Sequence, residues 1–311
     1  MASLLTNIAA MTALQALNQT NKETLTVQNR IATGLRVADA SDNAAYWSIA
    51  TTMRSDRQSL STVADALGLG AATVDVAVQG MEGAIKISSD IKAKLVAARQ
   101  PGVDRAKIQS EIAQLQESLS SVVHTATFSG QNWLAVDSTG TVERTLVSSF
   151  SRDGAGNITI GTISIDIGAT GTMLIDTSVP AGTSGAGILD QDRTVTNGAD
   201  YTVLTLDISA LTNDAADLED LEDMISGVDA AITSMTNAAT QLGAVKTRID
   251  TQNDFAKSLM DAIDTGIGQL VDADMNEEST RLQALQVRSQ LGVQALGLAN
   301  QSAQQILRLF Q

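Results

Sequence analysis

Apolar side chains recur at alternating intervals of three and four residues along two long segments of the chain. The first segment covers residues 46–95, where the pattern holds for about seven heptads. The second covers residues 218–270, where only Lys246 and Asn253 break the run of apolar positions. Such spacing is typical of long helices that pack against one another as coiled coils. The pattern therefore predicts two helical rods, the second of them roughly 80 Å long.

A third, shorter helix is predicted directly after the first rod. Pro101 and Gly102 end the rod because neither residue favours a helix interior, and Asp104 is suited to cap the helix that follows. The apolar side chains that then share one face are Ile108, Ile112, Leu115, Leu119 and Val122. A helix, a short turn and a second helix predict an antiparallel helical hairpin.

Residues 140–207 have a different composition, with ten glycines and no lysine. A turn is indicated at residues 154–157, and β-branched residues alternate with a period of two on either side of such turns. The strands predicted on this basis are 158–160 and 163–167, separated by Gly161, followed by 172–176 and 201–208. This part of the chain is therefore predicted to form a small β-rich insert with short strands.

The order of helical arm, β-rich insert and helical arm predicts the fold class. It is mainly α, with long antiparallel coiled-coil-like helices from both chain ends and a small β-rich central insert. Because the two arms match in length and period, we expect them to pack together with both termini at one end. The insert is then expected at the other end.

The two chain ends need separate treatment because they are apolar on one broad face and almost uncharged elsewhere. They cover residues 1–40 and 275–310. Ordering some 75 residues costs on the order of 100 kcal/mol, at ~1.5 kcal/mol each, and a core of two helices would not offset that cost. We therefore expect both ends to be poorly ordered in the isolated chain and to fold when neighbouring copies cover them.

Charge and composition exclude several classes of function. The chain has 20 basic and 35 acidic residues and a net charge of −15, so binding to nucleic acid or insertion into an anionic membrane is not expected. It has no cysteine and one histidine, His124, which excludes disulfides and multi-histidine metal sites. Neither a secretory signal peptide nor a transmembrane helix is predicted, because the longest uncharged stretches are rich in polar side chains. No catalytic residue, metal or cofactor is expected.

Two stretches near the chain ends form motifs. Residues 30–45 read R-I-A-T-G-L-R-V-A-D-A-S-D-N-A-A, and residues 272–278 read D-A-D-M-N-E-E. Residues 291–310 then read L-G-V-Q-A-L-G-L-A-N-Q-S-A-Q-Q-I-L-R-L-F. These motifs resemble the two ends of bacterial flagellin in residue order, in distance from the termini and in helical type. The resemblance covers about residues 1–135 and 212–311.

The resemblance implies a structural subunit that self-assembles into the bacterial flagellar filament, the passive helical propeller of swimming motility. It implies export through the flagellar type III apparatus with a chaperone, growth beneath a filament cap, contact with hook–filament junction proteins and an extracellular location. It also implies three domains. These are a terminal helical polymerisation domain (1–44 and 272–311), a long-helix rod (45–139 and 210–271) and a variable β-rich outer domain (140–209).

The polymerisation interface is expected on apolar and motif residues of both chain ends. The apolar stripes predict burial between subunits, and the resemblance adds the Gly-Leu-Arg motif and an asparagine near the C-terminus. The residues concerned are Leu4, Ile8, Met11, Leu14, Leu25, Ile31, Gly34, Leu35, Arg36, Leu282, Leu285, Leu296, Asn300, Ile306, Leu309 and Phe310.

The chain departs from the family pattern at two places. A proline that is common near the C-terminal glutamine of flagellins is Ala303 here. In many flagellins an innate immune receptor recognises an Arg-x-Arg-Glu-Leu run, and the aligned residues 91–95 read Ile-Lys-Ala-Lys-Leu. We therefore expect weak activation of that receptor.

Other interpretations of single features remain open but are less favoured. Ser120, Ser121 and His124 share a predicted helix, yet a surface histidine is the simpler interpretation without a nucleophile elbow or an orienting acid. Residues 272–278 lack the glycine of a calcium loop, which favours a helix-capping or solvated acidic run. For the whole chain, the alternatives are a hook–filament junction protein of the same superfamily, a secreted coiled-coil adhesin or effector, and an enzyme of unknown type.

Overall fold

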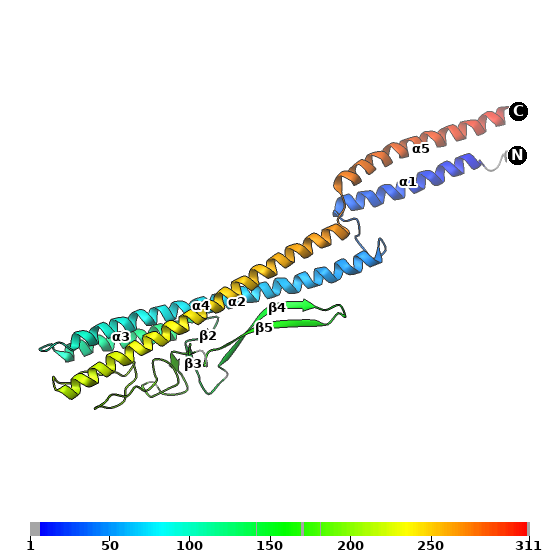
Figure 1. The fold of residues 1–311 in the computed structure, drawn as a ribbon. Helices are drawn as coiled ribbons and strands as arrows, with labels where there is room; N and C mark the ends of the chain where they lie inside the picture. The colour runs from blue at the N-terminus through cyan, green and yellow to red at the C-terminus, as the bar shows by residue number, and fades with distance from the viewer. Residues whose placement is uncertain (1–6, 141, 169–170, 181, 310–311) are drawn as a thin grey trace. The chain divides into compact units, whose positions relative to one another are not determined.

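A computed structural model describes residues 7–140, 142–168, 171–180 and 182–309, with the backbone alone for the helical residues 302–309. Long helices make up most of these residues, and short strands occur only between the third and the fourth helix of the described chain (Figure 1). This confirms the predicted fold class, which is mainly α with a small central region that contains strands.

The chain divides into two compact units. We call residues 1–58 together with 260–311 the terminal unit, and residues 59–259 the central unit. The two longest helices run through both units. The three-domain division expected from the sequence stays a prediction.

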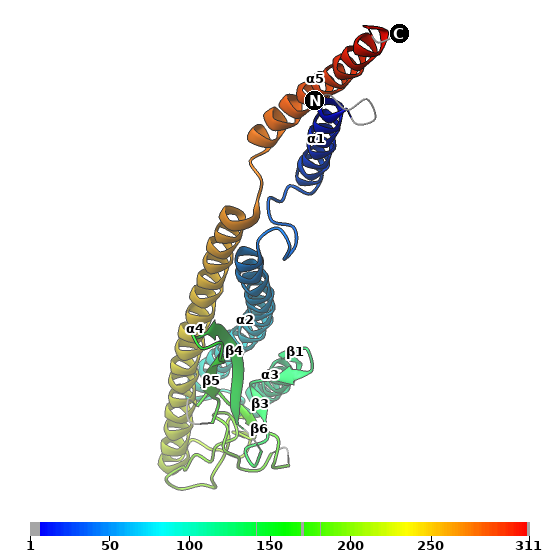
Figure 2. The same ribbon diagram turned by 90° about the vertical axis from the view of Figure 1, so that its right-hand side faces the viewer.

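Two helices from opposite ends of the sequence dominate the terminal unit. They are α1 (Ile8–Thr33) and α5 (Met275–Leu309), which lie side by side and run antiparallel (Figures 1 and 2). The unit also contains the first turns of α2 (Ala44–Ala98) and the last turns of α4 (Ala215–Val271). Their shared apolar cluster is small and consists of Val37, Ala50, Ile267 and Val271, with a few partly buried neighbours.

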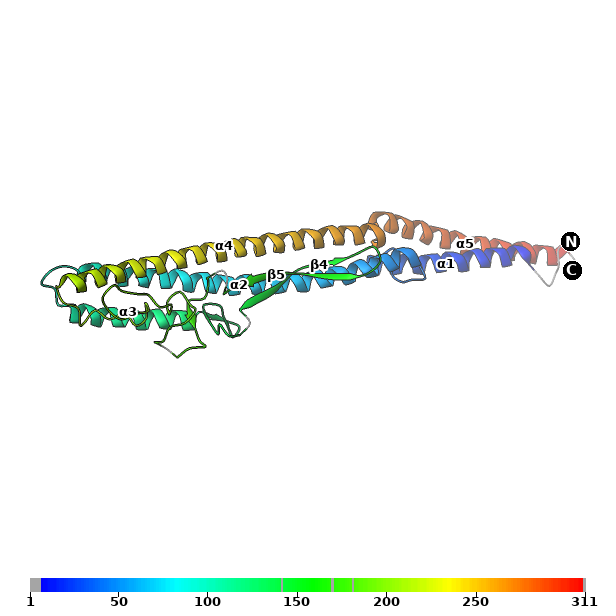
Figure 3. The same ribbon diagram turned by 60° about the horizontal axis from the view of Figure 1, so that its bottom comes forward.

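In the central unit, α2 and α4 run antiparallel along one another, and α3 (Arg105–Thr125) folds back beside them (Figures 1 and 3). The heptad positions predicted from the sequence form the core here. Leu67, Met81 and Leu95 of α2 and Val228 and Ile249 of α4 are fully buried. The long predicted rods are therefore confirmed, and their apolar faces meet each other.

The heptad prediction is wrong for the first turns of α2. Tyr46 and Ile49 are 41% and 49% exposed, whereas Ala50 is fully buried. Ala50 takes the core position because the helix packs there against the last turns of α4 and against the loop residue Val37.

The two polar interruptions of the second rod find partners on α2. Lys246 forms an ion pair with Asp75, and the amide of Asn253 donates to the carbonyl oxygen of Ala64 at 3.3 Å. Two more ion pairs join the same helices in the central unit, namely Lys92 with Asp229 and Arg99 with Glu222. The residue numbers of each ion pair add to the same total, as one continuous antiparallel register requires. Each pair is exposed and stabilises the helices by at most about 1 kcal/mol.

The hairpin between α2 and α3 forms as predicted. α2 ends at Ala98, and Gly102 adopts a φ of +84°, which glycine reaches without steric cost. The Asp104 carboxylate accepts from the backbone N–H of Lys107 at 3.3 Å and so caps α3. The buried Arg105 then donates to the carbonyl oxygen of Ala98 at 3.0 Å, which ties the two helix ends together.

The described residues of the insert between α3 and α4 form three two-stranded sheets. Two of the sheets are antiparallel pairs, β1 with β2 and β4 with β5. The third pairs β3 with β6 in parallel. The strands are β1 (Thr127–Phe128), β2 (Gln131–Asn132), β3 (Ala135–Val136), β4 (Glu143–Arg152), β5 (Ile158–Asp166) and β6 (Ile175–Asp176). The turn predicted at residues 154–157 joins β4 to β5, where the Asp153 carboxylate accepts from the backbone N–H of Asn157 at 2.8 Å.

The strand predictions are only partly confirmed. The two strands expected around Gly161 form one strand, β5. Opposite Gly161, strand β4 bulges between Val147 and Ser149. Only glycine at position 161 leaves room for the Ser149 hydroxyl, so Gly161 lies within the strand and does not end it. Of residues 172–176, only the last two form a strand. Residues 201–208 form no strand, and the long strand β4 is not among the predicted ones.

The expected position of the insert at the far end of the rods stays a prediction, and within the central unit the insert packs beside α3. Segment 203–208 runs along the side of α3, because Gln116 donates to the carbonyl oxygens of Val203 and Leu206 at 3.0 Å each. The Gln109 side chain accepts from the backbone N–H of Ile208 at 3.0 Å. Side-chain amides of α3 thus make the hydrogen bonds to the backbone of residues 203–208 that a neighbouring strand would otherwise make.

One helix of the described residues, α2, is long and apolar enough to cross a membrane by length and composition, with a mean hydropathy of 1.3 over its most apolar window. The apolar side of this helix is its heptad face, which packs on α4 in the central core. We attribute the high hydropathy to that core face, as is common for core helices.

Candidate assembly surface

Helix α1 has two apolar faces. On one face Thr20 and Val27 are buried at 4% and 3% exposure, and Leu17 is half-buried beside them. The hydroxyl of Thr20 donates to the carbonyl oxygen of Ala16 at 2.9 Å, so the threonine turns its methyl group to the interior. On the other face lie four large apolar side chains, namely Ile8 (71% exposed), Met11 (60%), Leu14 (48%) and Leu25 (60%). Because successive helix residues are about 100° apart, these two faces point in nearly opposite directions.

Helix α5 repeats this design. Its inner face carries Leu285, 6% exposed, and Gly292, whose Cα lies so close to α1 that an added Cβ would be 3.3 Å from Leu17 Cδ1. Its outer face carries Val287, Leu291 and Leu298, which are 56%, 58% and 68% exposed. These three follow helical spacing and lie about opposite the inner face. We call the four outer residues of α1 and these three of α5 the outward stripes.

The structure separates the residues predicted for the polymerisation interface into two groups. Ile8, Met11, Leu14 and Leu25 belong to the outward stripes, and Asn300 is exposed on α5. Ile31, Leu282, Leu285 and Leu296 lie on the inner faces, where α1 and α5 of the same chain meet. Leu4 and Phe310 lie outside the described residues, and of Ile306 and Leu309 only the backbone within α5 is described.

Sequence reasoning missed the outer face of α5. The predicted interface does not include Val287, Leu291 and Leu298, because the nearby Leu285 and Leu296 form an equally regular apolar stripe. The signal was present, since steps of four and seven residues also join these three positions. One apolar face per helix was expected, whereas this helix has two.

The Gly-Leu-Arg motif acts inside the chain. Gly34 ends α1 with a φ of +73°, and its carbonyl oxygen accepts from the backbone N–H of Ala273 at 2.9 Å. Leu35 forms a β-bridge with Asp272, and the Arg36 guanidinium donates to the carbonyl oxygen of Leu270 at 3.0 Å. The motif therefore fastens the end of α1 to the link between α4 and α5.

The acidic run at residues 272–278 caps a helix and forms one ion pair. The Asp274 carboxylate accepts from the backbone N–H of Asn276 at 2.8 Å at the start of α5, where the helix dipole favours negative charge. Glu278 is buried and lies 3.1 Å from a guanidinium nitrogen of Arg30. Within the part of the chain that the structure describes, no group of three or more His, Asp or Glu side chains is placed to hold a metal ion.

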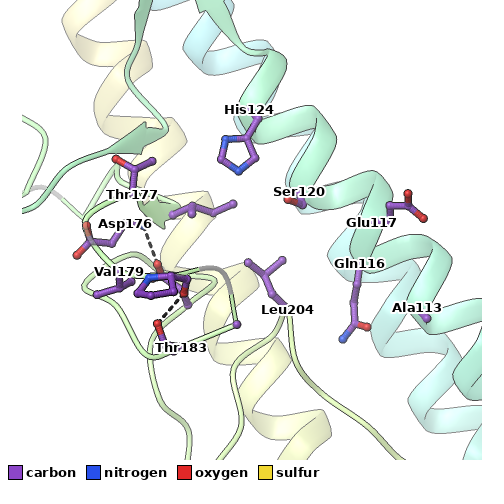
Figure 4. Close-up of a pocket in the computed structure, with 14 residues that line it drawn as sticks. Ala113, Gln116, Glu117, Ser120, His124, Asp176, Thr177, Val179, Thr183 and Leu204 are labelled. Atoms are coloured by element: carbon purple, nitrogen blue, oxygen red, sulfur yellow. Dashed lines mark hydrogen bonds between the residues drawn. The ribbon is translucent and has the colours of Figure 1, made fainter.

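A cavity of about 570 Å³ lies between α3 and the insert. Figure 4 shows Ser120 and His124 on α3 facing Thr177 and Thr183 of the insert. Thr183 is engaged by its own turn, since its hydroxyl donates to the carbonyl oxygen of Pro180 at 2.6 Å. Among the described residues, no hydrogen bond joins the His124 side chain to the hydroxyl of Ser120 or of Ser121, so these helix neighbours do not form a catalytic pair here.

The two buried carboxylates beside this cavity serve the insert. Burial acts to raise the pKa of Asp176, but hydrogen bonds from Ser138 and Ser178 outweigh it and hold that pKa well below its usual range. Burial raises the pKa of Asp190, whose carboxylate accepts from the backbone N–H of Asp176 at 2.6 Å. Both groups satisfy backbone donors of the loops and so act as structural carboxylates.

These features define a class of protein. The central unit closes its own core, whereas both helices of the terminal unit leave a second apolar face in water. Large exposed apolar surfaces in regular arrays mark sites where other protein copies bind, so the chain is a subunit of an assembly.

Comparison with known sequences identifies the family. Residues 4–139 match the bacterial flagellin N-terminal helical region, and residues 225–310 match the bacterial flagellin C-terminal helical region. The chain is 47% identical over 324 aligned residues to flagellin C of Rhizobium meliloti (strain 1021), with 100% of both chains covered. It is 41% identical over 311 residues to the flagellin of Brucella melitensis biotype 1, with 100% of this chain and 99% of that one covered.

The chain belongs to the bacterial flagellin family. It is a structural subunit that self-assembles into the extracellular flagellar filament of swimming motility, and it is not an enzyme. Flagellin A of Rhizobium meliloti (strain 1021), 41% identical, aligns over 399 residues and covers 100% of both chains. That aligned length exceeds the 311 residues of this chain, so the relative contains residues that have no counterpart here.

Proposed function

We propose that the outward stripes of α1 and α5 are the contacts by which copies of this chain join in the filament. The observation that carries the proposal is the opposition of two apolar faces on each helix, since one partner helix covers only one of them. Neighbouring copies then cover the other. In this arrangement the ends become fully ordered as they are covered, which limits premature assembly inside the cell.

The free energy of the outward stripes is large enough for this role. Full burial of a Val, Leu, Ile or Met side chain contributes about 1.5–3 kcal/mol. The seven side chains of the outward stripes are 48–71% exposed. Covering them therefore contributes on the order of 10 kcal/mol per subunit. The contact is heterologous, because a filament needs an open helical arrangement rather than a closed ring.

We assign the three segments of the chain to three roles. Residues 1–44 and 272–311 form the polymerisation domain, residues 45–139 and 210–271 the rod, and residues 140–209 the outer domain. The assignment is supported by the contrast between the two-faced helices of the terminal unit and the closed core of the central unit.

We further propose how the subunit reaches its place. It is exported through the flagellar type III apparatus with the help of a chaperone and adds beneath a filament cap, and the first copies contact hook–filament junction proteins. A chain whose ends become fully ordered only on assembly suits this route, because a narrow export channel passes unfolded or locally helical chain more readily than a rigidly folded end.

A pair of substitutions tests the proposed interface. Ile8→Asp together with Leu298→Asp places a carboxylate on each outward stripe, and burying an unpaired charge costs several kcal/mol. We expect purified double variant to add to filament seeds at a rate too low to measure by light scattering. Val96→Asp is the matched control, because Val96 is an equally exposed apolar residue of the central unit at 51%. Growth of the double variant at the rate of the control would refute the interface.

A further inference from the structure

The contact between α1 and α5 contains one charged side chain that is almost fully buried. Glu278 is 5% exposed, and its Oε1 accepts from a guanidinium nitrogen of Arg30 at 3.1 Å. The other carboxylate oxygen, Oε2, and the Nε atom of Arg30 are buried without a hydrogen-bond partner. The pair therefore makes one good hydrogen bond and leaves two polar atoms unsatisfied.

Such a pair adds little to stability. Taking the Glu278 carboxylate and most of the Arg30 side chain, which is 27% exposed, out of water is costly, and replacement of a buried ion pair by apolar side chains is often neutral or stabilising. The best-attested role of a polar group in a helix–helix interface is to fix the register. Glu278 lies in line with Leu282 and Leu285 on the inner face of α5, so it holds an interior position of this interface.

The remainder of the interface specifies register weakly, since the one other ion pair among its described residues, Arg288 with Glu23 at 3.9 Å, is exposed and contributes little. Its inner faces are built from small or uniform residues, among them Thr20 and Val27 on α1 and Leu285 and Gly292 on α5. At the far end, the amide of Asn7 donates to a backbone carbonyl oxygen at 2.9 Å, a partner that every residue of a helix end offers. A slip of one heptad, about 10 Å, would therefore place apolar residues on apolar residues again.

The slip would not be neutral for Glu278. Because the helices run antiparallel, a slip of one heptad would place Glu278 opposite Glu23 in one direction. In the other direction it would move Glu278 beyond Thr33, where α1 ends. The first slip brings two carboxylates together, although Glu23 is 43% exposed, and the second separates the Glu278 carboxylate from its partner.

The β-bridge between Leu35 and Asp272, together with the hydrogen bonds of Gly34 and Arg36 described above, forms one anchor at the bases of the two helices. One anchor of this kind leaves each helix free to turn about its own axis and to shift once the bridge opens. A second specific contact further along the helices removes that freedom.

We infer that Arg30 and Glu278 are positioning residues that fix the register and rotation of α1 against α5, so that the outward stripes face neighbouring copies in one fixed arrangement. The inference rests on the proposed role of the outward stripes. A slipped pair keeps its inner faces covered but displaces one outward stripe along the other, so the subunit no longer matches the end of a growing filament.

Disulfide formation reports the register directly. The chain has no cysteine, and a Cβ built on Gly292 lies 3.9 Å from Leu17 Cβ, which suits a disulfide. Leu17→Cys with Gly292→Cys therefore reports the native register, and Ala10→Cys with Gly292→Cys reports the slip by one heptad. With Arg30 and Glu278 in place, we expect the native reporter to cross-link at least ~10-fold more than the slipped reporter.

The decisive variant is Arg30→Leu with Glu278→Leu. It removes the charges and keeps an apolar interior, so we expect no loss of thermal stability. The cross-linking ratio should fall to about 1–3, and elongation from seeds should fall about 3-fold, as expected when three registers are equally populated and one is competent. An unchanged ratio with unchanged elongation would overturn the inference.

Two further variants separate positioning from simple structural support. Arg30→Lys keeps a single donated hydrogen bond and should keep the ratio and the rate within about 2-fold of the unsubstituted chain. Exchange of the two charges, Arg30→Glu with Glu278→Arg, restores attraction in the native register but also lets the introduced arginine face Glu23 after a slip. The slipped reporter should therefore rise, and its failure to rise would contradict the inference.

The control is Lys257→Gln, which removes an exposed ion pair of the central unit and should change neither readout. The cross-linking ratio is measured on soluble chains as well as on sedimented filaments. If the outward stripes do not drive assembly, the Ile8→Asp and Leu298→Asp variant grows normally while the ratio still reports the register, so the two failures are distinguishable.

Discussion

The terminal unit and the central unit of this flagellin differ in charge and in core. The terminal unit has 8 basic and 10 acidic residues, a formal net charge of −2, whereas the central unit has 12 and 25, a net charge of −13. The central unit has one extended apolar core that joins its helices to the insert, and the terminal unit has only a small cluster beside the α1–α5 pair. One unit is therefore built to be stable alone, and the other is built to be completed by neighbours.

The difference explains how one chain can be both soluble and able to polymerise. Copies that meet through nearly neutral ends pay little Coulomb repulsion at the contact itself. The strongly acidic central unit keeps single copies apart at a distance, where repulsion is screened by salt. Recognition and solubility are thus assigned to different parts of the sequence.

Removal of the terminal helices should have the largest effect on assembly. A chain truncated to residues 34–274 lacks α1 and α5, and with them every residue of the outward stripes. We expect no filaments by electron microscopy, because the proposed contacts are gone. Cooperative thermal unfolding of the central unit, followed by circular dichroism, should persist within a few degrees of the full chain. Loss of that transition would show that the central unit depends on the ends.

Matched leucine truncations in the two units should have the next largest effects, one on stability and the other on filament growth. Leu67 of the central unit is fully buried and Leu25 of the terminal unit is 60% exposed. Leu67→Ala is expected to lower the free energy of unfolding by about 2–5 kcal/mol through the cavity it leaves. Leu25→Ala should lower it by less than about 0.5 kcal/mol in soluble chains yet slow filament growth. Urea unfolding and seeded elongation measure the two effects, and equal stability losses would contradict the division of roles.

Alkaline pH should weaken the central unit through Tyr201. This side chain is 5% exposed, and its hydroxyl donates to the carbonyl oxygen of Asp223 at 3.2 Å. Burial raises the pKa of Tyr201 to about 12, against about 10 in an unfolded chain. Below pH 10 both states keep the proton, and between pH 10 and 12 the unfolded state alone loses it, so stability falls as pH rises.

The expected loss is about 2 kcal/mol between pH 10 and 12. Tyr201→Phe keeps the ring and removes the titrating group, so its stability should fall less steeply over the same range. The difference between the two urea-unfolding series gives the contribution of Tyr201 alone, because lysines that titrate in the same pH range affect both series equally. Parallel series would show that Tyr201 is not responsible.

The sequence predicts the helices of both units but not all of their partners. Repeating apolar positions define α2 and α4, and Asp104 marks the start of α3, because these signals are local. The interruptions Lys246 and Asn253 could not be understood from one helix, since their partners Asp75 and Ala64 lie on another. The same limit applies to α1 and α5, where either of two regular stripes was an equally good inner face.

The insert was predicted least well for a related reason. Residues 201–208 alternate as a strand does, but a strand needs a neighbour, and glutamines of α3 satisfy this backbone instead. The local pattern predicts that one strand ends and another begins at Gly161, because it does not reveal the bulge opposite this residue on β4. Local spacing identifies helices whose apolar positions repeat regularly. It fails where single side chains, rather than a neighbouring strand, satisfy the backbone hydrogen bonds.

Salt should change assembly by the smallest amount, and through the central unit alone. Raising the ionic strength from 0.01 M to 0.1 M shortens the screening length from about 30 Å to about 10 Å, which weakens repulsion between the central units of −13 net charge. Seeded elongation, followed by light scattering, should therefore become a few-fold faster.

The matched test exchanges exposed acidic residues that have no ion-pair role, such as Glu82→Gln with Glu143→Gln in the central unit. These substitutions should speed growth at low salt and have little effect at 0.1 M, where the charges are already screened. Growth of the neutralised variant at low salt no faster than that of the unsubstituted chain would contradict repulsion between the central units as the source of the salt effect.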